Sequence, residues 1–588
     1  MLLRARGSIL SCLAAGLFSA LVLLTCFASG STAQSIAVES KNLPQHLTEE
    51  ELGRLDEIGI NQTATPPPIS PIRHVAQWEP AEGVLIRFDG SFFALSYDLI
   101  SSLSEELIVY VLCEASDEQN AYDDMSAAGV NMANVAFITC TTNSQWTRDY
   151  GPEFIFTNGL SGLVDHVYNR PRPDDDVVSW ELGTELGLDV YATDLVTSGG
   201  NFMSDGHGIA FSTDLILDEN PTLSYEDISQ IMNDYLGITQ YNVLPDISTE
   251  GIHHIDCWAK LLDEETILVK EVWPEHPDYA AIEANVATLE TLTNCYGRPY
   301  DIVRIYCGKI RQNTAACYTN SIILNDRVYV PLYRIDEDAA ALATYEAAMP
   351  GYEVLGFTGS WLADDAIHCR VLGVHDQDML FVDTNPIQDI EVNSSDYRVE
   401  SVIDDKSEAG LVPEELLVYW RLEGETAFNA ITMMAAGEPD IYFAEIPKQA
   451  DETTVEYYIS AEDYSGRIST EPPVAPGALY SFDTGTTQTT DADTPGAKLA
   501  LEQNHPNPFN PSTTIRFHLL EAGYVTLKVY DASGREIALL ADGFHSDGTH
   551  TVEWNGKNSL GTPMNSGVYF YELRTDKGVE SRKMILIR

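Results

Sequence analysis

Short apolar runs separated by polar turns fill the chain from about Val75 to Thr384. Runs rich in β-branched and aromatic residues predict strands, and the clearest are EGVLIRF, ELIVYVLC, NVAFITC, GPEFIFT, GLVDHVY, GIAFS, ETILVKEV, DIVRIYC and RVYVPLY. Helical spacing of apolar residues predicts helices at 96–107, 219–237 and 279–294. Strands that alternate with helices predict an α/β domain over 75–385. Polar residues recur at strand ends, which suggests internal pseudo-repeats around a central cavity.

Beyond about Asn385 the pattern changes to short strands without helices. YRVESVIDD, EELLVYWRLEG, YFAEIP and TVEYYISAED are spaced as in an immunoglobulin-like β-sandwich, predicted over 386–483. The stretch TGTTQTTDADTPGA predicts a flexible linker over 484–497. A third, strand-rich unit follows over 498–588 and predicts a second β-sandwich.

The N-terminus has the pattern of a secretory signal over 1–33: Arg4 and Arg6, an apolar run, then small residues before Gln34. The alternative is an uncleaved membrane anchor. An N-terminal extension over 34–74 holds a predicted helical patch, LTEEELGRLDEIG, and a Pro-rich connector. No later stretch is apolar and long enough to cross a bilayer. The mature chain is therefore expected to be secreted or on the outer cell surface, without a transmembrane segment.

Composition narrows the functional classes. Of 588 residues, 44% are hydrophobic and 10% aromatic, which is typical of a globular protein. The net charge of -57 argues against nucleic-acid partners and weakly favours cationic substrates. Nine cysteines become seven after the signal, without a CxxC pair or zinc-like spacing. No metal site or other cofactor is predicted, but a reactive thiol is a candidate.

The stretch 251–272, GIHHIDCWAKLLDEETILVKEV, predicts a strand, a turn at Asp263 and a second strand. Alternation along a strand would place His254 and Asp256 on one face, about 6 to 7 Å apart, and Cys257 on the other. An imidazole and a carboxylate on one face can move a proton and bind a cation. The alternative is an exposed pair on a half-buried strand.

Three further residues are candidates in the same domain. Cys369 lies between a polar loop and an apolar strand, Asp149 precedes a Gly-Pro turn, and Asn320 precedes an apolar run. Alone, each has a structural explanation: a core cysteine, a turn cap and a turn residue. Together with His254 and Asp256 they suit the hydrolysis of a guanidinium group. Two carboxylates can hold its N–H groups, a thiolate can attack its carbon, and a histidine can protonate the departing ammonia.

Five motifs, WTRDYGP, GGNFMSDG, HIDCW, YTNS and AIHCR, together resemble the bacterial, Porphyromonas-type peptidylarginine deiminase and agmatine deiminase family. The resemblance implies a five-bladed pseudo-symmetric α/β propeller, the pentein fold. By motif it implies roles for the candidates above: Cys369 as nucleophile, His254 as general acid and base, Asp149 and Asp256 as guanidinium ligands, Asn320 beside the site, and Trp146 on the aliphatic stem of the substrate. It further implies catalysis without calcium, with which a structural cation is compatible.

Within that family, the stretch YNRPRPDDD distinguishes two branches. Arg170 and Arg172 resemble the pair that receives the α-carboxylate of a C-terminal arginine in the peptidyl branch. We therefore predict a deiminase that converts peptide or protein arginine to citrulline. One alternative is that both arginines pair with 174–176 on the surface and that agmatine is the substrate. Others are a thiol amidase and an inactive surface adhesin.

The C-terminal unit carries a second resemblance. LEQNHPNPFNPSTTIRFHL and GVYFYELRTDKGVESRKMILIR resemble the sorting domain read by type IX secretion. This implies the type IX secretion machinery as a partner. The alternative is a plain third sandwich domain.

Overall fold

The computed structural model describes residues 43–60, 62–247, 251–311, 313–361, 364–388, 396–485 and, with further gaps, 500–586. The predicted signal over 1–33, the start of the extension and nearly all of the linker lie outside the described residues. The chain divides into two compact units, Met1–Thr487 and Gln488–Arg588. Among the described residues, no helix is sufficiently long and apolar to cross a membrane.

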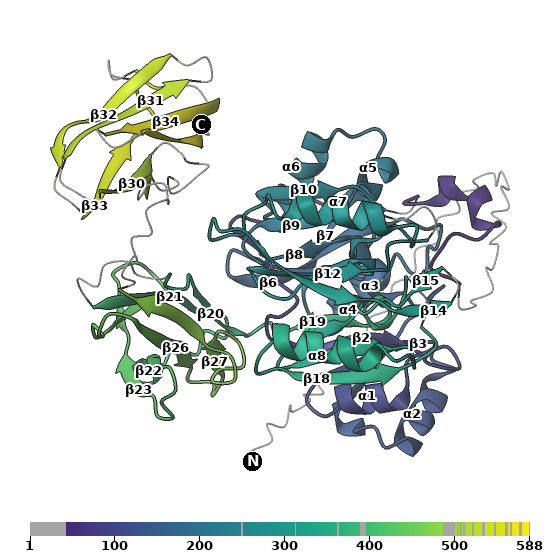
Figure 1. Ribbon diagram of the computed structural model, residues 1–588. Helices are drawn as coiled ribbons and strands as arrows, with labels where there is room; N and C mark the ends of the chain where they lie inside the picture. The colour runs from purple at the N-terminus through teal and green to yellow at the C-terminus, as the bar shows by residue number, and fades with distance from the viewer. Residues whose placement is uncertain are drawn as a thin grey trace, which may run out of the picture. The chain divides into compact units, whose positions relative to one another are not determined.

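Five sheets of three or four strands form the α/β part of the first unit (Figure 1). Their strands, in spatial order, are β19 (Leu372–His375), β2 (Ala81–Arg87), β3 (Ile108–Cys113) and β4 (Val135–Thr139); β1 (Ile72–His74), β5 (Glu153–Thr157), β6 (Leu160–Tyr168) and β7 (Asp189–Thr197); β10 (Gln240–Leu244), β9 (Ile209–Thr213) and β8 (Met203–Ser204); β11 (Ala259–Leu261), β12 (Thr266–Glu271) and β13 (Asp301–Tyr306); β16 (Ile322–Leu324), β17 (Arg327–Leu332) and β18 (Glu353–Thr358). A small hairpin, β14 (Lys309–Arg311) with β15 (Thr314–Ala315), lies between the last two sheets in the chain.

All five sheets share one pairing pattern. In each, an antiparallel pair is followed by a parallel one, as in β5·β6·β7, β8·β9·β10, β11·β12·β13, β16·β17·β18 and β19·β2·β3. A parallel pair requires a crossover connection, usually a helix. The crossovers contain α1 (Tyr97–Leu103), α4 (Val178–Leu186), α5 (Leu215–Glu219) with α6 (Tyr225–Leu236), α7 (Tyr279–Leu289) and α8 (Asp338–Ala348). The recurring unit agrees with the predicted pseudo-repeats.

The local predictions hold for most elements. Each of the nine quoted runs contains a strand, and the three predicted helices correspond to α1, α6 and α7. Helix α6 begins at a reciprocal capping box between Ser224 and Asp227 and ends at left-handed Gly237. The helix α2 (Glu118–Ala127) and the crossover helices α4 and α8 were not predicted, because their apolar faces are short.

The helical patch predicted in the extension is wrong in extent. It forms two single 3₁₀ turns, Glu51–Gly53 and Leu55–Glu57, with most of its apolar side chains exposed or half-buried. The glycines at 53 and 59 disfavour a continuous helix, since glycine costs about 1 kcal/mol in a helix interior.

Five connections carry the chain from one of the five sheets to the next. They run from β4 to β5, from β7 to β8, from β10 to β11, from β13 through the hairpin to β16, and from β18 to β19. Two of them contain one-turn helices, α3 (Thr147–Tyr150) and α9 (Ile367–Arg370). Several separate apolar clusters form beneath the sheets. The five candidate catalytic residues and Trp146 lie on these connections, whereas Arg170 and Arg172 lie on the crossover from β6 to β7.

A β-sandwich completes the first unit. One sheet has the order β20 (Leu380–Thr384), β21 (Tyr397–Asp405), β25 (Ile441–Ile446), β24 (Met434–Ala435); the other has β23 (Asn429–Thr432), β22 (Leu417–Leu422), β26 (Thr453–Glu462), β27 (Ile468–Glu471), with β28 (Tyr480–Thr484) beside β26. The sandwich begins at β20, a few residues before the expected boundary at 385/386. Arg467 contacts Asp376 through Nε–Oδ2 and Nη2–Oδ1 distances of 3.0 and 3.1 Å, which ties the sandwich to the α/β part.

The second unit is built only from strands in its described residues. One sheet contains β29 (Ala500–Leu501), β30 (Thr513–Leu519) and β33 (Gly548–Trp554); the other contains β32 (Glu536–His545), β31 (Gly523–Asp531), β34 (Gly567–Arg574) and β35 (Val579–Leu586). Both faces contribute to one apolar core that includes Trp554 and Tyr571. A β-rich unit was predicted here.

Candidate functional site

Two carboxylates and an imidazole surround Gly200. A Cβ atom at Gly200 would lie 2.7 Å from Asp149 Oδ1, 2.7 Å from His254 Nδ1 and 3.2 Å from Asp256 Oδ2. All three side chains are buried. Asp149 belongs to α3, Gly200 to the turn between β7 and β8, and His254 and Asp256 to the connection that enters β11. Three of the five connections therefore meet at one point.

Cys369 joins this group from the connection that carries α9. Its Sγ lies 3.2 Å from Asn320 Nδ2 and 3.8 Å from Asp256 Oδ2. Asn320 Nδ2 also donates to Asp256 Oδ2 at 3.0 Å, and its Oδ1 accepts from the Ala366 backbone N–H at 2.9 Å. One amide thus fixes the carboxylate relative to the thiol. The structure brings together all five residues predicted as catalytic.

The predicted strand register around His254 is wrong. Residues Ile255–Cys257 form a 3₁₀ turn, and the strand begins only at Ala259. The backbone at His254 is extended, and the turn after it swings Asp256 toward Gly200. Cys257 packs in an apolar cluster, as expected of a residue that does not enter the site. Asp149 likewise lies on a one-turn helix and not at a strand end. The predicted turn at Asp263 and the strand β12 after it are confirmed.

Burial controls the protonation of the group. It raises the pKa of Asp149 to about 6, partly offset by a hydrogen bond from Gln45. Burial, followed by the charge of Asp149, raises the pKa of Asp256 well above its ordinary value. Burial and then Arg170 lower the pKa of His254 far below its ordinary value. The histidine is therefore a neutral base at pH 7.

The thiol is also neutral in this state. Burial, and next the charge of Asp256, raises the pKa of Cys369 well above its ordinary value. Within this cluster, Asp149 Oδ1 and both ring nitrogens of His254 are buried and have no hydrogen-bond partner among the described residues. His254 Nδ1 and Asp149 Oδ1 are 3.7 Å apart, too far for a direct hydrogen bond. Unpaired buried polar atoms are costly, and a bound donor would satisfy the carboxylate.

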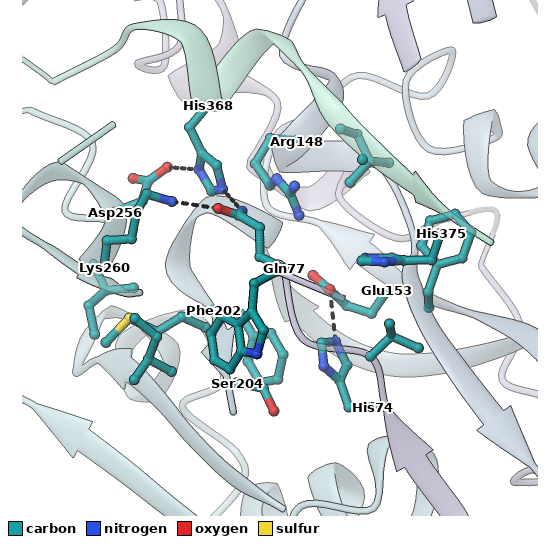
Figure 2. A pocket seen from close by; sticks show the side chains of 18 of the residues that line it. His74, Gln77, Arg148, Glu153, Phe202, Ser204, Asp256, Lys260, His368 and His375 are labelled. Carbon is teal, nitrogen blue, oxygen red and sulfur yellow. Dashed lines mark hydrogen bonds and ion pairs between the residues drawn. The ribbon is translucent and has the colours of Figure 1, made fainter. Parts of the chain in front are cut away.

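A row of hydrogen-bonded side chains leads from Lys260 to Asp256 (Figure 2). Lys260 Nζ donates to Gln77 Oε1 at 2.8 Å, Gln77 Nε2 lies 2.7 Å from His368 Nε2, and His368 Nδ1 lies 2.8 Å from Asp256 Oδ2. Lysine can only donate, so it orients the Gln77 amide with its nitrogen toward His368. His368 Nε2 must then accept, which leaves the proton on Nδ1, facing the carboxylate.

These supporting residues line a cavity of about 50 Å³ next to Asp256 (Figure 2). His74, Arg148, Glu153 and His375 also line it, and His74 Nε2 lies 3.1 Å from Glu153 Oε2. Burial lowers the pKa of Lys260 to about 7 and that of His368 well below its ordinary value.

The sequence analysis did not identify Gly200, Gln77, Lys260 or His368. Gly200 and His368 lie inside quoted motifs, GGNFMSDG and AIHCR, so the motif positions themselves carried a signal. Lys260 follows HIDCW on the next strand and reads as a surface lysine. Nothing in the sequence around Gln77 sets it apart.

The three residues predicted to bind substrate contact the N-terminal extension. Trp146 Nε1 donates to the Leu43 carbonyl at 2.9 Å, and the Arg370 guanidinium lies 4.7 Å from the centre of the Trp146 ring. Arg170 Nε donates to the Gln45 carbonyl at 3.0 Å. Arg172 Nε donates to Glu51 Oε1 at 2.7 Å.

The alternative of a surface network with 174–176 does not describe the two arginines, which are buried. The acidic residues there have other partners: Asp175 Oδ1 accepts from the Asn143 and Ser144 backbone N–H groups, and Asp176 Oδ1 from that of Tyr168. Arg170 and Arg172 thus contact the extension, which also reaches Asp149 through Gln45.

Comparison with known families defines the class of the α/β part. Residues 80–371 match the model of the Porphyromonas-type peptidyl-arginine deiminase family, and residues 512–578 match that of the FlgD Ig-like domain. Homologues of the matched α/β region are agmatine and peptidyl-arginine deiminases, hydrolases that act on C–N bonds of amidines. The two matches confirm the predicted deiminase resemblance and an Ig-like C-terminal unit.

Individual relatives carry agmatine deiminase names. The chain is 25% identical over 305 residues to an agmatine deiminase of Pseudomonas fluorescens, covering 44% of this chain and 81% of the relative. It is 25% identical over 290 residues to one of Pseudomonas syringae pv. tomato, covering 42% and 78%. A solved agmatine deiminase of Enterococcus faecalis is similar, with a TM-score of 0.47, 23% identity and coverage of 52% and 96%.

Proposed function

We propose that this site hydrolyses a guanidinium group to a ureido group and ammonia, with Cys369 as nucleophile. The observation that supports it best is the cluster around Gly200, where two buried carboxylates and a neutral histidine lie beside a buried thiol. Asp149 Oδ1 has no protein donor among the described residues, and a guanidinium N–H would supply one. The five sheets with one shared pairing pattern would be the blades of the pentein propeller.

The chemistry follows from the protonation states. A bound cation next to Asp149 and Asp256 favours ionisation of Cys369, whose proton passes to neutral His254. The thiolate attacks the guanidinium carbon, the C–N bond breaks, and His254 returns the proton to the leaving ammonia. Water, deprotonated by the same imidazole, then attacks the S-alkylthiouronium carbon. The C–S bond breaks, the ureido product leaves, and the thiol is restored.

We propose peptidyl arginine with a free C-terminal carboxylate as substrate. Arg170 and Arg172 are two buried guanidinium groups at the entrance, and their contacts in this structure are carbonyl and carboxylate oxygens. A carboxylate from the substrate backbone would suit the same donors. Agmatine remains the second candidate, because the similar proteins named above are agmatine deiminases.

A colorimetric ureido assay tests both the proposed reaction and the proposed substrate. Arginine-terminated peptides, their C-terminal amides, free arginine and agmatine are compared on the chain and on Cys369→Ala. We expect Cys369→Ala to lose all turnover while its circular dichroism stays unchanged. Each charge-assisted contact is worth about 1.5 to 3 kcal/mol, so the free-acid peptide should exceed its amide by roughly a hundredfold. Turnover by Cys369→Ala contradicts the mechanism, and agmatine as best substrate contradicts the peptidyl assignment.

We also propose export, with the C-terminal unit as a type IX sorting signal. The support is the signal-like N-terminus and the C-terminal motifs, together with an Ig-like unit that forms its own core. Secretion from a type IX host should depend on residues 498–588. Equal secretion of a chain that lacks them contradicts the role.

A further inference from the structure

Residues 43–51 lie against the candidate site. Their polar atoms contact four residues assigned above to catalysis or substrate binding. Leu43 binds Trp146, Gln45 binds Asp149 and Arg170, and Pro44 and Glu51 bind Arg172. We call this stretch the 43–51 segment. Contacts this specific, made by a stretch outside the five sheets, require an explanation.

Gln45 contacts Asp149, one of the two carboxylates proposed to bind a substrate guanidinium. Its Nε2 donates to Asp149 Oδ2 at 2.8 Å, and the side chain is buried. The same amide also partly offsets the rise that burial causes in the pKa of the Cys369 thiol. A planar amide N–H that faces Asp149 beside Cys369 resembles one edge of a guanidinium. Unlike a guanidinium it carries no charge, so its contact with Asp149 lacks the second charge that strengthens a guanidinium–carboxylate pair.

Glu51 occupies the position expected for a substrate carboxylate. Its Oε1 accepts from Arg172 Nε at 2.7 Å and its Oε2 from Nη2 at 3.3 Å. Both side chains are buried. Burial alone would raise the pKa of Glu51, but the hydrogen bond and charge of Arg172 hold it below its ordinary value. The carboxylate is therefore ionised and engages the arginine in the fork geometry that Arg172 would offer a peptide terminus.

The segment is only partly packed against the domain. A cavity of about 560 Å³ lies between it and the domain, lined by His46, Leu47, Arg170, Glu219 and His253 among others. This cavity opens to solvent, so the domain does not cover this side of the segment. A loosely packed stretch held mainly by polar contacts can leave without unfolding the sheets.

We propose that the 43–51 segment is an intrachain substrate mimic that blocks the site until it is displaced or cut away. This inference rests on the function proposed above, since it assigns Gln45 and Glu51 to the places of a guanidinium and a carboxylate. Basic cleavage positions flank the segment on both sides: Lys41 precedes it, and the first lysine or arginine after it is Arg54. Its side chain is 20% exposed and pairs with Glu57.

Single substitutions test the block in the complete chain. Gln45→Ala and Glu51→Gln each remove one mimic contact, and Glu50→Gln is a matched control at an exposed neighbour. We expect kcat/KM for the free-acid peptide to rise at least about tenfold in the first two variants, since 1.4 kcal/mol of lost competition corresponds to tenfold. The control should match the unsubstituted chain. An unchanged or reduced kcat/KM in both variants overturns the block.

Thiol labelling separates this proposal from the proposed reaction. The rate at which 2-chloroacetamide and the cationic 2-chloroacetamidine alkylate Cys369 is followed by mass spectrometry, without any turnover. Faster labelling of Cys369 in Gln45→Ala and Glu51→Gln, and in the chain after brief trypsin treatment, supports the block even if no guanidine is hydrolysed. Equal labelling in all forms overturns it. Faster labelling without ureido formation by any form contradicts the reaction alone.

Discussion

Gly200 is the residue on which the geometry of the site depends most directly. A methyl group there would stand 2.7 Å from both Asp149 Oδ1 and His254 Nδ1, distances that real Cβ atoms essentially never show. Gly200→Ala must therefore displace Asp149, the proposed guanidinium ligand, or His254, the proposed acid-base group, or both. A displacement of about 1 Å in an active site can cost roughly a hundredfold in rate, so we expect kcat/KM to fall by at least that factor in the ureido assay.

Gly543→Ala is the matched control, because a Cβ atom there meets nothing within 4 Å. It should leave kcat/KM unchanged. Activity of Gly200→Ala within threefold or so of the unsubstituted chain would show that Asp149 and His254 do not act from these positions.

The carboxyl group of Asp149 predicts a pH dependence. Burial raises its pKa to about 6, so it is neutral below that pH and ionised above it. Only the ionised form attracts a guanidinium. We expect kcat/KM for a cationic substrate to fall progressively as the pH drops below about 6, measured in buffers of constant ionic strength. A profile that stays flat down to pH 5 contradicts this role.

The raised pKa of Asp149 affects stability in the opposite direction to activity: as the pH rises, activity increases but the stability of the fold decreases. A carboxyl whose pKa is raised in the folded state stabilises the fold while it is protonated and loses that contribution as the pH rises through about 6. Asp149→Asn should be inactive at every pH, yet at pH 8 more stable than the unsubstituted chain by on the order of 2 kcal/mol. Near pH 4 the difference should largely disappear, as thermal unfolding at the two pH values can show.

Sequence reasoning identified the five candidate catalytic residues but not their supports. Cys369, His254 and Asp149 have reactive or ionisable side chains and lie inside recognisable motifs. Gln77 and Lys260 act only through contacts between distant parts of the chain. Lys260 Nζ donates to Gln77 Oε1, although the two residues are 183 positions apart in the sequence. Such partners follow from tertiary packing, which local pattern does not contain.

At the scale of elements, a row of hydrogen bonds runs from Lys260 on β11 through Gln77 to His368 on α9 and ends at Asp256. It joins three separate parts of the polypeptide. Gln77→Leu removes the amide but keeps similar volume. His368 then loses the donor that fixes its tautomer, and Asp256 loses a defined hydrogen-bond donor. We expect kcat/KM to fall about tenfold, consistent with the loss of about 1.4 kcal/mol in ligand positioning.

The measurement should include the pH profile, because the freed imidazole would take up a proton more readily. Gln119→Leu on the exposed face of α2 is the control and should change nothing. A change of stability in Gln77→Leu with an unaltered pH profile and kcat/KM would assign the chain a structural role only.

Elements with long apolar runs were predictable, and the turn at Ile255–Cys257 was not. The run IDCWAKLL satisfies strand composition throughout, so period alone cannot locate where the strand begins. The backbone N–H of Ile255 instead bonds to Asn201 Oδ1, and that contact to another connection favours the 3₁₀ turn. Tertiary hydrogen bonds override local preference here.

For the whole molecule, the net charge of -57 is the dominant electrostatic fact. Mutual repulsion of so many carboxylates opposes the compact state and is screened by salt. We expect the Tm to rise by about 2 to 4 °C between about 10 and 200 mM NaCl, the effect of roughly 1 kcal/mol. Differential scanning calorimetry measures it. A Tm that falls over this range would show that attractive ion pairs outweigh the repulsion.

The five connections between sheets have a consequence for how activity can be used as a probe. Asp149, Gly200, Asp256, Asn320 and Cys369 come from five different connections. No half of the α/β part can therefore hold the complete candidate site. In a denaturant titration, the enzymatic rate should disappear when the first of the five sheets unfolds. This loss should come before, or together with, the loss of the circular dichroism signal of the whole chain. Turnover would then report on the weakest of the five sheets rather than on average folding.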